Sequence, residues 1–379
     1  MISRFHLPTE IIFGSGVVSR ISQIAENEFE AKKVFLVTDK GIRKAGIDQS
    51  LVSEFQKITV FDYVEPNPKH RTVNKAGEIA RKLNTDLIIG LGGGSSLDAA
   101  KAVALLVTNK GQIEDYEGKY KYEVPPIPVV AVPTTCGTGS EVTWSSVITH
   151  TERKFKMSIK GPHTFPSVAL VDPDLLKTLP QNLIASTGMD ALVHAVEAYS
   201  VKPSTFITDL FAEKAIKMIF RFLERAYKDI KEDIEARENM MKASMLAGVA
   251  FGNSDVGAVH CIAESVGGMY DIPHGVANSI FLPYVMEFNL PEAVDSYSKI
   301  AGFIGIKEKS RKKAAEKLIQ EIRHLSRKLN IPRFDQIGIQ ESQFKIIAEK
   351  SFQNNSNPSN PREAAVKDYF QILKDAFLD

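Results

Sequence analysis

The sequence has few cysteines, almost no net charge and no long apolar run, and each absence excludes a class of protein. Its two cysteines, Cys136 and Cys261, form no pair at zinc-finger spacing, and their scarcity favours a reducing compartment. The 47 basic and 46 acidic residues leave a net charge of +1, whereas nucleic-acid-binding proteins carry a basic surplus on one face. No uncharged apolar stretch reaches the roughly 18 residues of a membrane span, and the first ten residues lack the pattern of a signal peptide. We therefore expect a cytoplasmic protein that binds neither nucleic acid nor membrane.

The first half of the chain predicts an α/β domain. Short apolar runs at 32–39, 86–92 and 124–133 are typical of buried parallel strands. Helical patterns such as 73–83 fall between them. Strands and helices in alternation indicate a doubly wound sheet.

The pattern changes near residue 180. Beyond it, segments such as 206–223 and 237–251 repeat apolar residues at helical spacing, and strand candidates become rare. At about 150 residues per domain, the chain has room for two or three domains. We predict two, an α/β domain over 1–180 and a helical domain over 181–379.

A glycine-rich turn, G-G-S-S-L-D-A-A-K, runs from Gly93 to Lys101 after the predicted strand 86–92. Glycine lets the backbone approach a ligand closely, and Ser95 or Ser96 can cap the following helix. The helix N-terminus then suits a phosphate or pyrophosphate. The turn is neither a P-loop nor the six-position Rossmann pattern, because Ser95 stands where the last glycine would be. A tight turn without a ligand is the alternative.

A second small-residue turn, P-T-T-C-G-T-G-S-E-V-T, runs from Pro133 to Thr143 after the third predicted strand. It presents hydroxyl groups at the carboxyl end of the sheet, where open α/β sheets bind ligands. The two turns together indicate a dinucleotide site. Asp39, at the end of an earlier strand, can accept hydrogen bonds from a ribose diol and repel a 2′-phosphate, which favours NAD over NADP. A helix-capping role for Asp39 fits equally well.

The stretch T-G-M-D-A-L-V-H-A-V-E-A-Y-S places Asp190 and His194 four residues apart, on one side of a helix. Alone, they indicate a buried hydrogen-bonded pair. A second pair, His260 and His274, lies in similarly apolar surroundings. Unpaired buried polar groups cost about 1–3 kcal/mol each, and one divalent cation would satisfy all four. Three imidazoles and a carboxylate suit Fe(II), Zn(II), Co(II) or Ni(II) better than Mg or Ca. Cys261 is rotated about 100° from His260, so we do not expect it to be a ligand.

Other motifs lie near the two ends of the chain, namely P-T-E-I-I-F-G-S-G from Pro8 and N-P-R-E-A-A-V-K-D-Y-F-Q-I-L-K-D-A-F from Asn360. With the two turns, D-A-L-V-H-A-V-E-A-Y and the H-x13-H segment ending in P-H-G, they occur in one order along the whole chain. In this combination the sequence resembles the iron-containing (group III) alcohol dehydrogenases.

The resemblance implies an N-terminal Rossmann-like domain with a parallel sheet and an all-helical C-terminal metal-binding domain. It implies transfer of hydride between a primary alcohol or diol and NAD, with NADP possible, and the reverse reduction of an aldehyde. The ion would be Fe(2+), with Zn(2+) or another divalent transition metal as the alternative, in a homo-oligomer. The implied metal ligands are Asp190, His194, His260 and His274. The implied cofactor contacts are Asp39, Asn67, Gly94, Ser95, Thr134, Thr135, Thr143, Lys156 and Leu175.

One position departs from the family pattern. Many members carry a further histidine four residues after the third ligand, where it is a candidate for proton exchange near the substrate. This chain has Glu264 there. A positioned carboxylate also moves protons, so Glu264 is a catalytic candidate. The alternatives are a supporting contact to the ligands or a plain salt bridge.

Three other functions remain open. Glycerol dehydrogenases and dehydroquinate synthases share the implied fold, although the second helix ligand, His194, argues against their three-ligand sites. A non-catalytic NAD-binding regulator with a structural metal is the third, because sequence does not show whether a metal site is open to substrate. Phe251 and Trp144 are candidates for apolar walls of a substrate pocket.

Overall fold

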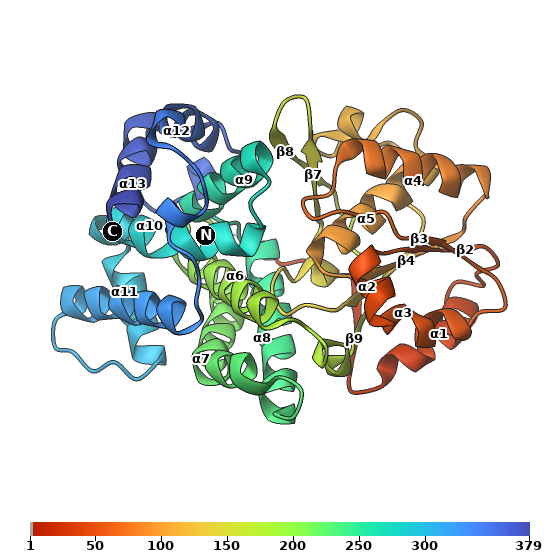
Figure 1. Cartoon of the computed structure of the whole chain (residues 1–379), viewed down its shortest axis with the longest axis horizontal. Helices are drawn as coiled ribbons and strands as arrows, with labels where there is room; N and C mark the ends of the chain where they lie inside the picture. The colour runs from red at the N-terminus through yellow and green to blue at the C-terminus, as the bar shows by residue number, and fades with distance from the viewer. Residues whose placement is uncertain (1–2) are drawn as a thin grey trace. The chain divides into compact units, whose positions relative to one another are not determined.

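The computed structural model describes residues 3–379, which divide into two compact units (Figure 1). One unit comprises His6–Thr135 and Gly139–Leu179. The other comprises Pro180–Asp379, together with residues 3–5 and the loop Cys136–Thr138. The assignment of cofactor binding to 1–180 and of catalysis to 181–379 stays a prediction.

A six-stranded parallel sheet forms the centre of the first unit, as the alternating pattern predicts. The spatial order is β1-β9-β6-β4-β2-β3, so the chain reverses direction across the sheet between β2 and β4. The strands are β1 (Glu10–Phe13), β2 (Val34–Val37), β3 (Ile58–Phe61), β4 (Leu87–Gly92), β6 (Val129–Pro133) and β9 (Val168–Val171).

Two hydrophobic cores cover the two faces of this sheet. Successive side chains of a strand point to opposite faces. Val34 and Leu36 belong to one core with residues of α1, α2 and α3, whereas Phe35 and Val37 belong to the other with residues of α4 and α5. Figure 1 shows these two groups of helices on opposite sides of β2, β3 and β4. The helices are α1 (Ile21–Asn27), α2 (Lys40–Ala45), α3 (Ile47–Ser53), α4 (His70–Lys82) and α5 (Gly94–Thr108).

The predicted elements agree in type with the structure and differ at their ends. The expected strand 124–133 begins only at Val129, because prolines fill the preceding segment and proline has no N–H to donate to a ladder. A small second sheet was not predicted from the sequence. It contains the antiparallel pair β7 (Ser145–His150) and β8 (Phe155–Lys160), with β5 (Gly118–Lys119) beside β8.

The second unit is helical, and the described residues after Val171 contain no strand. Its buried helix α6 packs against α7, α8 and α10. Side chains of Thr205, Asp233 and Ser310 cap α7, α8 and α11 by accepting from backbone N–H groups. The helices are α6 (Gln181–Ser200), α7 (Phe206–Asp229), α8 (Ile234–Asn253), α9 (Ala258–Tyr270), α10 (His274–Phe303), α11 (Arg311–Lys328), α12 (Phe344–Phe352) and α13 (Val366–Leu378). Within residues 3–379, no helix has both the length and the apolar character needed to cross a membrane.

Candidate functional site

Most of the predicted cofactor contacts lie at the carboxyl edge of the parallel sheet. Because the strands are parallel, the segments that follow them emerge at the same edge. Two contacts lie elsewhere, since Thr143 follows the short 3-10 helix η3 (Ser140–Val142) and the buried Lys156 lies on β8. The residues after the strand ends are Asp39 (β2), Asn67 (β3), Gly94 and Ser95 (β4), Thr134 and Thr135 (β6), and Leu175 (β9).

Asp39 and the glycine-rich turn meet where the chain reverses direction across the sheet. One carboxylate oxygen of Asp39 accepts from the backbone N–H of Ile42 at 3.0 Å and caps α2. The other accepts from the Ser96 hydroxyl at 3.3 Å. The prediction that Ser95 or Ser96 caps α5 is wrong: the N-cap is Gly93, without a side-chain hydrogen bond, because Ser96 faces Asp39 instead.

Gly92 allows this close approach. Its φ is +146°, and a Cβ atom there would lie 2.6 Å from the Ser96 hydroxyl oxygen. A side chain at this position would therefore push Ser96 away from Asp39. The contact between the two strand ends depends on a glycine.

A buried lysine forms hydrogen bonds to the second small-residue turn, 133–143. The Lys101 ammonium donates to the carbonyl of Ser140 at 3.0 Å and to the hydroxyl of Thr143 at 3.4 Å, and it pairs with Asp98 at 3.2 Å. Asp98 in turn accepts from the Ser140 hydroxyl at 2.6 Å. Burial lowers the pKa of Lys101, and the neighbouring Asp98 opposes that shift. This role was not predicted from the sequence, although the three-residue spacing of Asp98 and Lys101 after the glycines indicates a pair on one helix face.

The four predicted metal ligands converge inside the helical unit. Asp190 and His194 come from α6, His260 from α9, and His274 is the first residue of α10. One ligand atom from each residue lies within 4.8 Å of the others. Asp190, His194 and His260 are at most 3% exposed, whereas His274 is partly exposed.

Asn278, one turn after His274 on α10, marks the point on which the ligand atoms converge. Its side-chain nitrogen lies 2.6 Å from Asp190 Oδ1 and 3.1 Å from both His260 Nε2 and His274 Nε2. Three acceptors thus face one small donor group. Asn278 could not be predicted from the sequence, since asparagine is common and only the fold brings it here.

The chemistry of this donor set fits a divalent transition metal. His194 Nδ1 is buried and has no hydrogen-bond partner within the described part of the chain. Burial and the neighbouring His260 hold the pKa of His194 well below its usual range, so its ring is neutral and keeps a lone pair. Burial also lowers the pKa of His260, but Glu197 and Asp190 outweigh it and the net shift is upward. A cation would replace the protons and hydrogen bonds that this cluster otherwise needs.

A second glycine brings His274 close to α6. A Cβ atom on Gly275 would lie 2.4 Å from the carbonyl oxygen of Ser186 and 3.4 Å from the Cβ atom of Asp190. The first turn of α10 therefore packs directly on the backbone of α6. This contact sets how near His274 comes to Asp190, whose Oδ1 lies 4.0 Å from His274 Nε2.

Other predicted residues lie around the cluster or apart from it. Phe251 stacks on the His194 ring with centroids 4.2 Å apart, whereas Trp144 packs against Tyr120 in the first unit. Glu264 accepts from the Asn354 amide at 2.6 Å and is not one of the four converging residues. Burial raises the pKa of Cys261 well above its usual range, so this thiol stays protonated.

The fold and the cluster together are typical of dinucleotide-linked, metal-dependent oxidoreductases. The family follows from comparison with known proteins. The family model "Iron-containing alcohol dehydrogenase" matches residues 8–173, and the model "Fe-containing alcohol dehydrogenase family, C-terminal" matches residues 184–377. The chain belongs to the iron-containing alcohol dehydrogenase family, which confirms the resemblance seen in its motifs.

Relatives match over nearly the whole chain. The NAD-dependent methanol dehydrogenase of Bacillus methanolicus is 37% identical, covering 99% of this chain and 100% of the relative. The 1,3-propanediol dehydrogenase of Citrobacter freundii is 39% identical, covering 98% of each chain. Among solved structures, a 1,3-propanediol oxidoreductase superposes with a TM-score of 0.95 at 38% identity and covers 100% of both chains.

Proposed function

We propose that this protein, an NAD(P)-dependent alcohol oxidoreductase by its family, transfers hydride between a primary alcohol or diol and NAD. In the reverse direction it reduces the corresponding aldehyde. The observation that carries the proposal is the convergence of four ligand atoms, three of them from buried residues, within 4.8 Å of one another, on three different helices. The names of the methanol and propanediol dehydrogenases support a small alcohol as the substrate class.

Asp190, His194, His260 and His274 would hold the ion, which we propose is Fe(2+), with Zn(2+) as the alternative. When bound, such an ion supplies Lewis acidity, which favours loss of the hydroxyl proton from an alcohol near neutral pH. The chain contributes a neutral His194 ring, and Phe251 covers one face of that ring against water. The buried carboxylate of Asp190 would balance part of the ion's charge.

For the cofactor, we propose NAD at the carboxyl edge of the sheet, with the ribose diol at Asp39 and the pyrophosphate at the start of α5. We propose that the nine residues implied by the family resemblance contact this cofactor. Glu264 is the candidate for moving the proton. One carboxylate oxygen of Glu264 accepts a hydrogen bond from Asn354, which holds the side chain in position. A proton that passes through Glu264 would therefore use a carboxylate fixed by this bond.

Replacing a ligand histidine tests the proposed function. In His260→Ala or His274→Ala, we expect loss of the metal and of NADH formation from small alcohols, because either change removes one of the four ligands. NADH binding, followed by fluorescence, should be retained, since both residues lie outside the sheet unit. Full turnover by either variant, or by wild-type protein stripped with a chelator, would refute the mechanism. Accumulation of free NADH separates the dehydrogenase from a lyase that recycles its NAD internally.

The assembly and the compartment belong to the same proposal. We propose a homo-oligomer in the cytoplasm. Both cysteines are buried and free, which suits a reducing compartment. Light scattering of the purified holoenzyme would give the number of chains, and a monomer would contradict this part of the proposal.

A further inference from the structure

A buried glutamate contacts His260, one of the four predicted metal ligands. Glu197 lies on α6, three residues after His194, and is 5% exposed. Its Oε2 atom lies 2.6 Å from His260 Nδ1, and its Oε1 atom accepts from the backbone N–H of Val259 at 2.9 Å. One carboxylate therefore holds both the imidazole and the backbone of the first turn of α9.

This contact decides which nitrogen of His260 faces the other ligands. A carboxylate only accepts hydrogen bonds, so the short contact places a proton on Nδ1 of His260. The Nε2 atom then keeps its lone pair, and it is this atom that points toward Asn278 and the remaining ligands. A metal-binding imidazole commonly needs such a partner to fix its tautomer and orientation.

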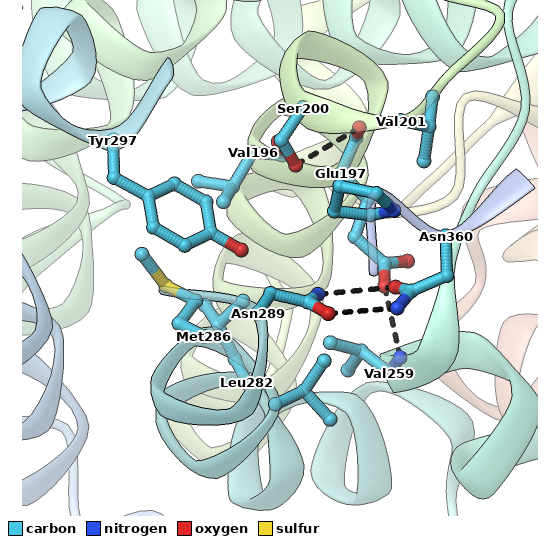
Figure 2. Close-up of a pocket in the computed structure, with 12 residues that line it drawn as sticks. Val196, Glu197, Ser200, Val201, Val259, Leu282, Met286, Asn289, Tyr297 and Asn360 are labelled. Carbon is cyan, nitrogen blue, oxygen red and sulfur yellow. Dashed lines mark hydrogen bonds between the residues drawn. The ribbon is translucent and has the colours of Figure 1, made fainter. Parts of the chain in front are cut away.

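Two asparagines lie beside Glu197 and hold the start of α9 (Figure 2). Asn360 accepts from the backbone N–H of Ala258 at 3.1 Å and pairs with Asn289 through two hydrogen bonds of 2.7 and 3.0 Å. Gly257 precedes α9, and a Cβ atom there would lie 2.9 Å from Asn360 Oδ1 and 3.0 Å from Glu197 Oε1. The positive end of the α9 dipole also favours a negative charge at this position.

We propose that Glu197 is a positioning residue for the metal centre, which holds His260 with its Nε2 lone pair directed into the cluster. This inference rests on the proposed function in one respect, namely that the four-residue cluster binds an ion. It adds a specific role for a residue that contacts neither the ion nor the substrate. The fixed tautomer and orientation of His260 are what Glu197 contributes to metal affinity.

A purely structural role is the competing explanation, because Glu197 also satisfies a backbone N–H at the start of α9. Asn360 provides the matched control. It satisfies the adjacent N–H of the same helix end, but within residues 3–379 it makes no hydrogen bond with His260. A change that only loosens the start of α9 should affect the Asn360→Ala and Glu197 variants alike.

The test is a Co(2+) titration of metal-stripped wild type, Glu197→Gln, Glu197→Leu and Asn360→Ala. It records the visible absorption of bound Co(2+) and measures affinity by competition with a chelator. We expect Glu197→Gln to lose about 10- to 100-fold in affinity, the usual effect of removing such a partner, with an altered spectrum. A carboxamide has one oxygen for two N–H donors, so Glu197→Gln should retain part of the affinity and Glu197→Leu less. Asn360→Ala should bind Co(2+) with nearly wild-type affinity and spectrum.

The outcomes separate the inference from the proposed function. Absence of Co(2+) binding by wild type would overturn the proposed metal centre itself. Wild-type affinity and spectrum in Glu197→Gln would overturn the role of Glu197 and leave the centre intact. Equal losses in Glu197→Gln and Asn360→Ala would also overturn it, in favour of simple anchoring of α9. If Glu197→Gln fails to fold, Glu197→Asp, whose shorter carboxylate cannot reach both donors, replaces it in the same comparison.

Discussion

Asp39 combines a structural and a predicted chemical role in one side chain. It caps α2 through one oxygen and accepts from Ser96 through the other, so the capping role weighed from the sequence is present. The proposed contact with a ribose diol uses the same carboxylate from the solvent side. Its negative charge is the feature that would discriminate against a 2′-phosphate.

The substitution Asp39→Asn separates these roles. Asparagine caps helices as well as aspartate does, so the free energy of unfolding should change little. Two like charges about 4 Å apart repel by roughly 1–4 kcal/mol near a protein surface. Removing the charge should therefore raise the ratio of kcat/KM for NADP to that for NAD by at least about fivefold. An unchanged ratio in steady-state assays would show that Asp39 does not face the ribose.

At the residue scale, sequence indicated those side chains whose types are rare and whose spacing is informative. Asp190, His194, His260 and His274 could be grouped because the chain has only eight histidines and these three lie in apolar segments. Glu197 and Asn278 could not be found in this way. Both types are common, and their positions beside His260 depend on how α6, α9 and α10 pack.

The contact between α10 and α6 gives a prediction at the scale of elements. In Gly275→Ala, the new methyl group would meet the Ser186 carbonyl at 2.4 Å, so the start of α10 must move away from Asp190. We expect weaker metal binding, by at least about tenfold, measured by chelator competition.

Gly302→Ala is the control on the same helix. A Cβ atom at Gly302 meets nothing within 4 Å. Alanine there should leave metal affinity unchanged and stabilise the helix by up to about 1 kcal/mol. Equal metal affinity in the two variants would contradict the claim that close packing of α10 on α6 positions His274.

The buried Glu141, in η3, should make the stability of the fold depend on pH. Burial raises the pKa of Glu141 from its ordinary 4.5 to about 7. Between these pH values the folded chain keeps a proton that the unfolded chain releases, so this group's contribution to stability is full below pH 4.5 and is lost as pH rises to 7. The loss is on the order of 3 kcal/mol. Glu141→Gln should flatten this part of the urea-unfolding profile, and an unaltered slope would contradict a protonated Glu141.

Element types were predictable from the sequence, and element ends were less so. The apolar runs and helical periods located β2, β4 and α8 within a few residues, whereas α7 runs beyond the predicted 206–223 to Asp229. The β7–β8 pair was missed, since its strands are half-buried, polar in part and stabilised by pairing with each other. Which serine faces Asp39 depended on the approach of β2 to β4, which no local pattern contains.

At the scale of the whole molecule, the sequence predicted the order of architectures correctly, a doubly wound sheet followed by helices.

A ligand that binds only the folded state stabilises it, by about 2.7 kcal/mol when its free concentration is 100 times the dissociation constant. We therefore expect Zn(2+) to raise the midpoint of thermal unfolding of metal-stripped protein. His274→Ala should show no rise. An equal rise in this variant would place the stabilising ion elsewhere.

The most direct test of the metal centre is a crystallographic anomalous difference map. Data would be collected at the iron and zinc edges from protein purified without oxygen. We predict one strong peak per chain within bonding distance of Asp190, His194, His260 and His274, with Glu197 still bonded to His260. A fully loaded protein whose anomalous peak lies away from these four side chains would contradict the account.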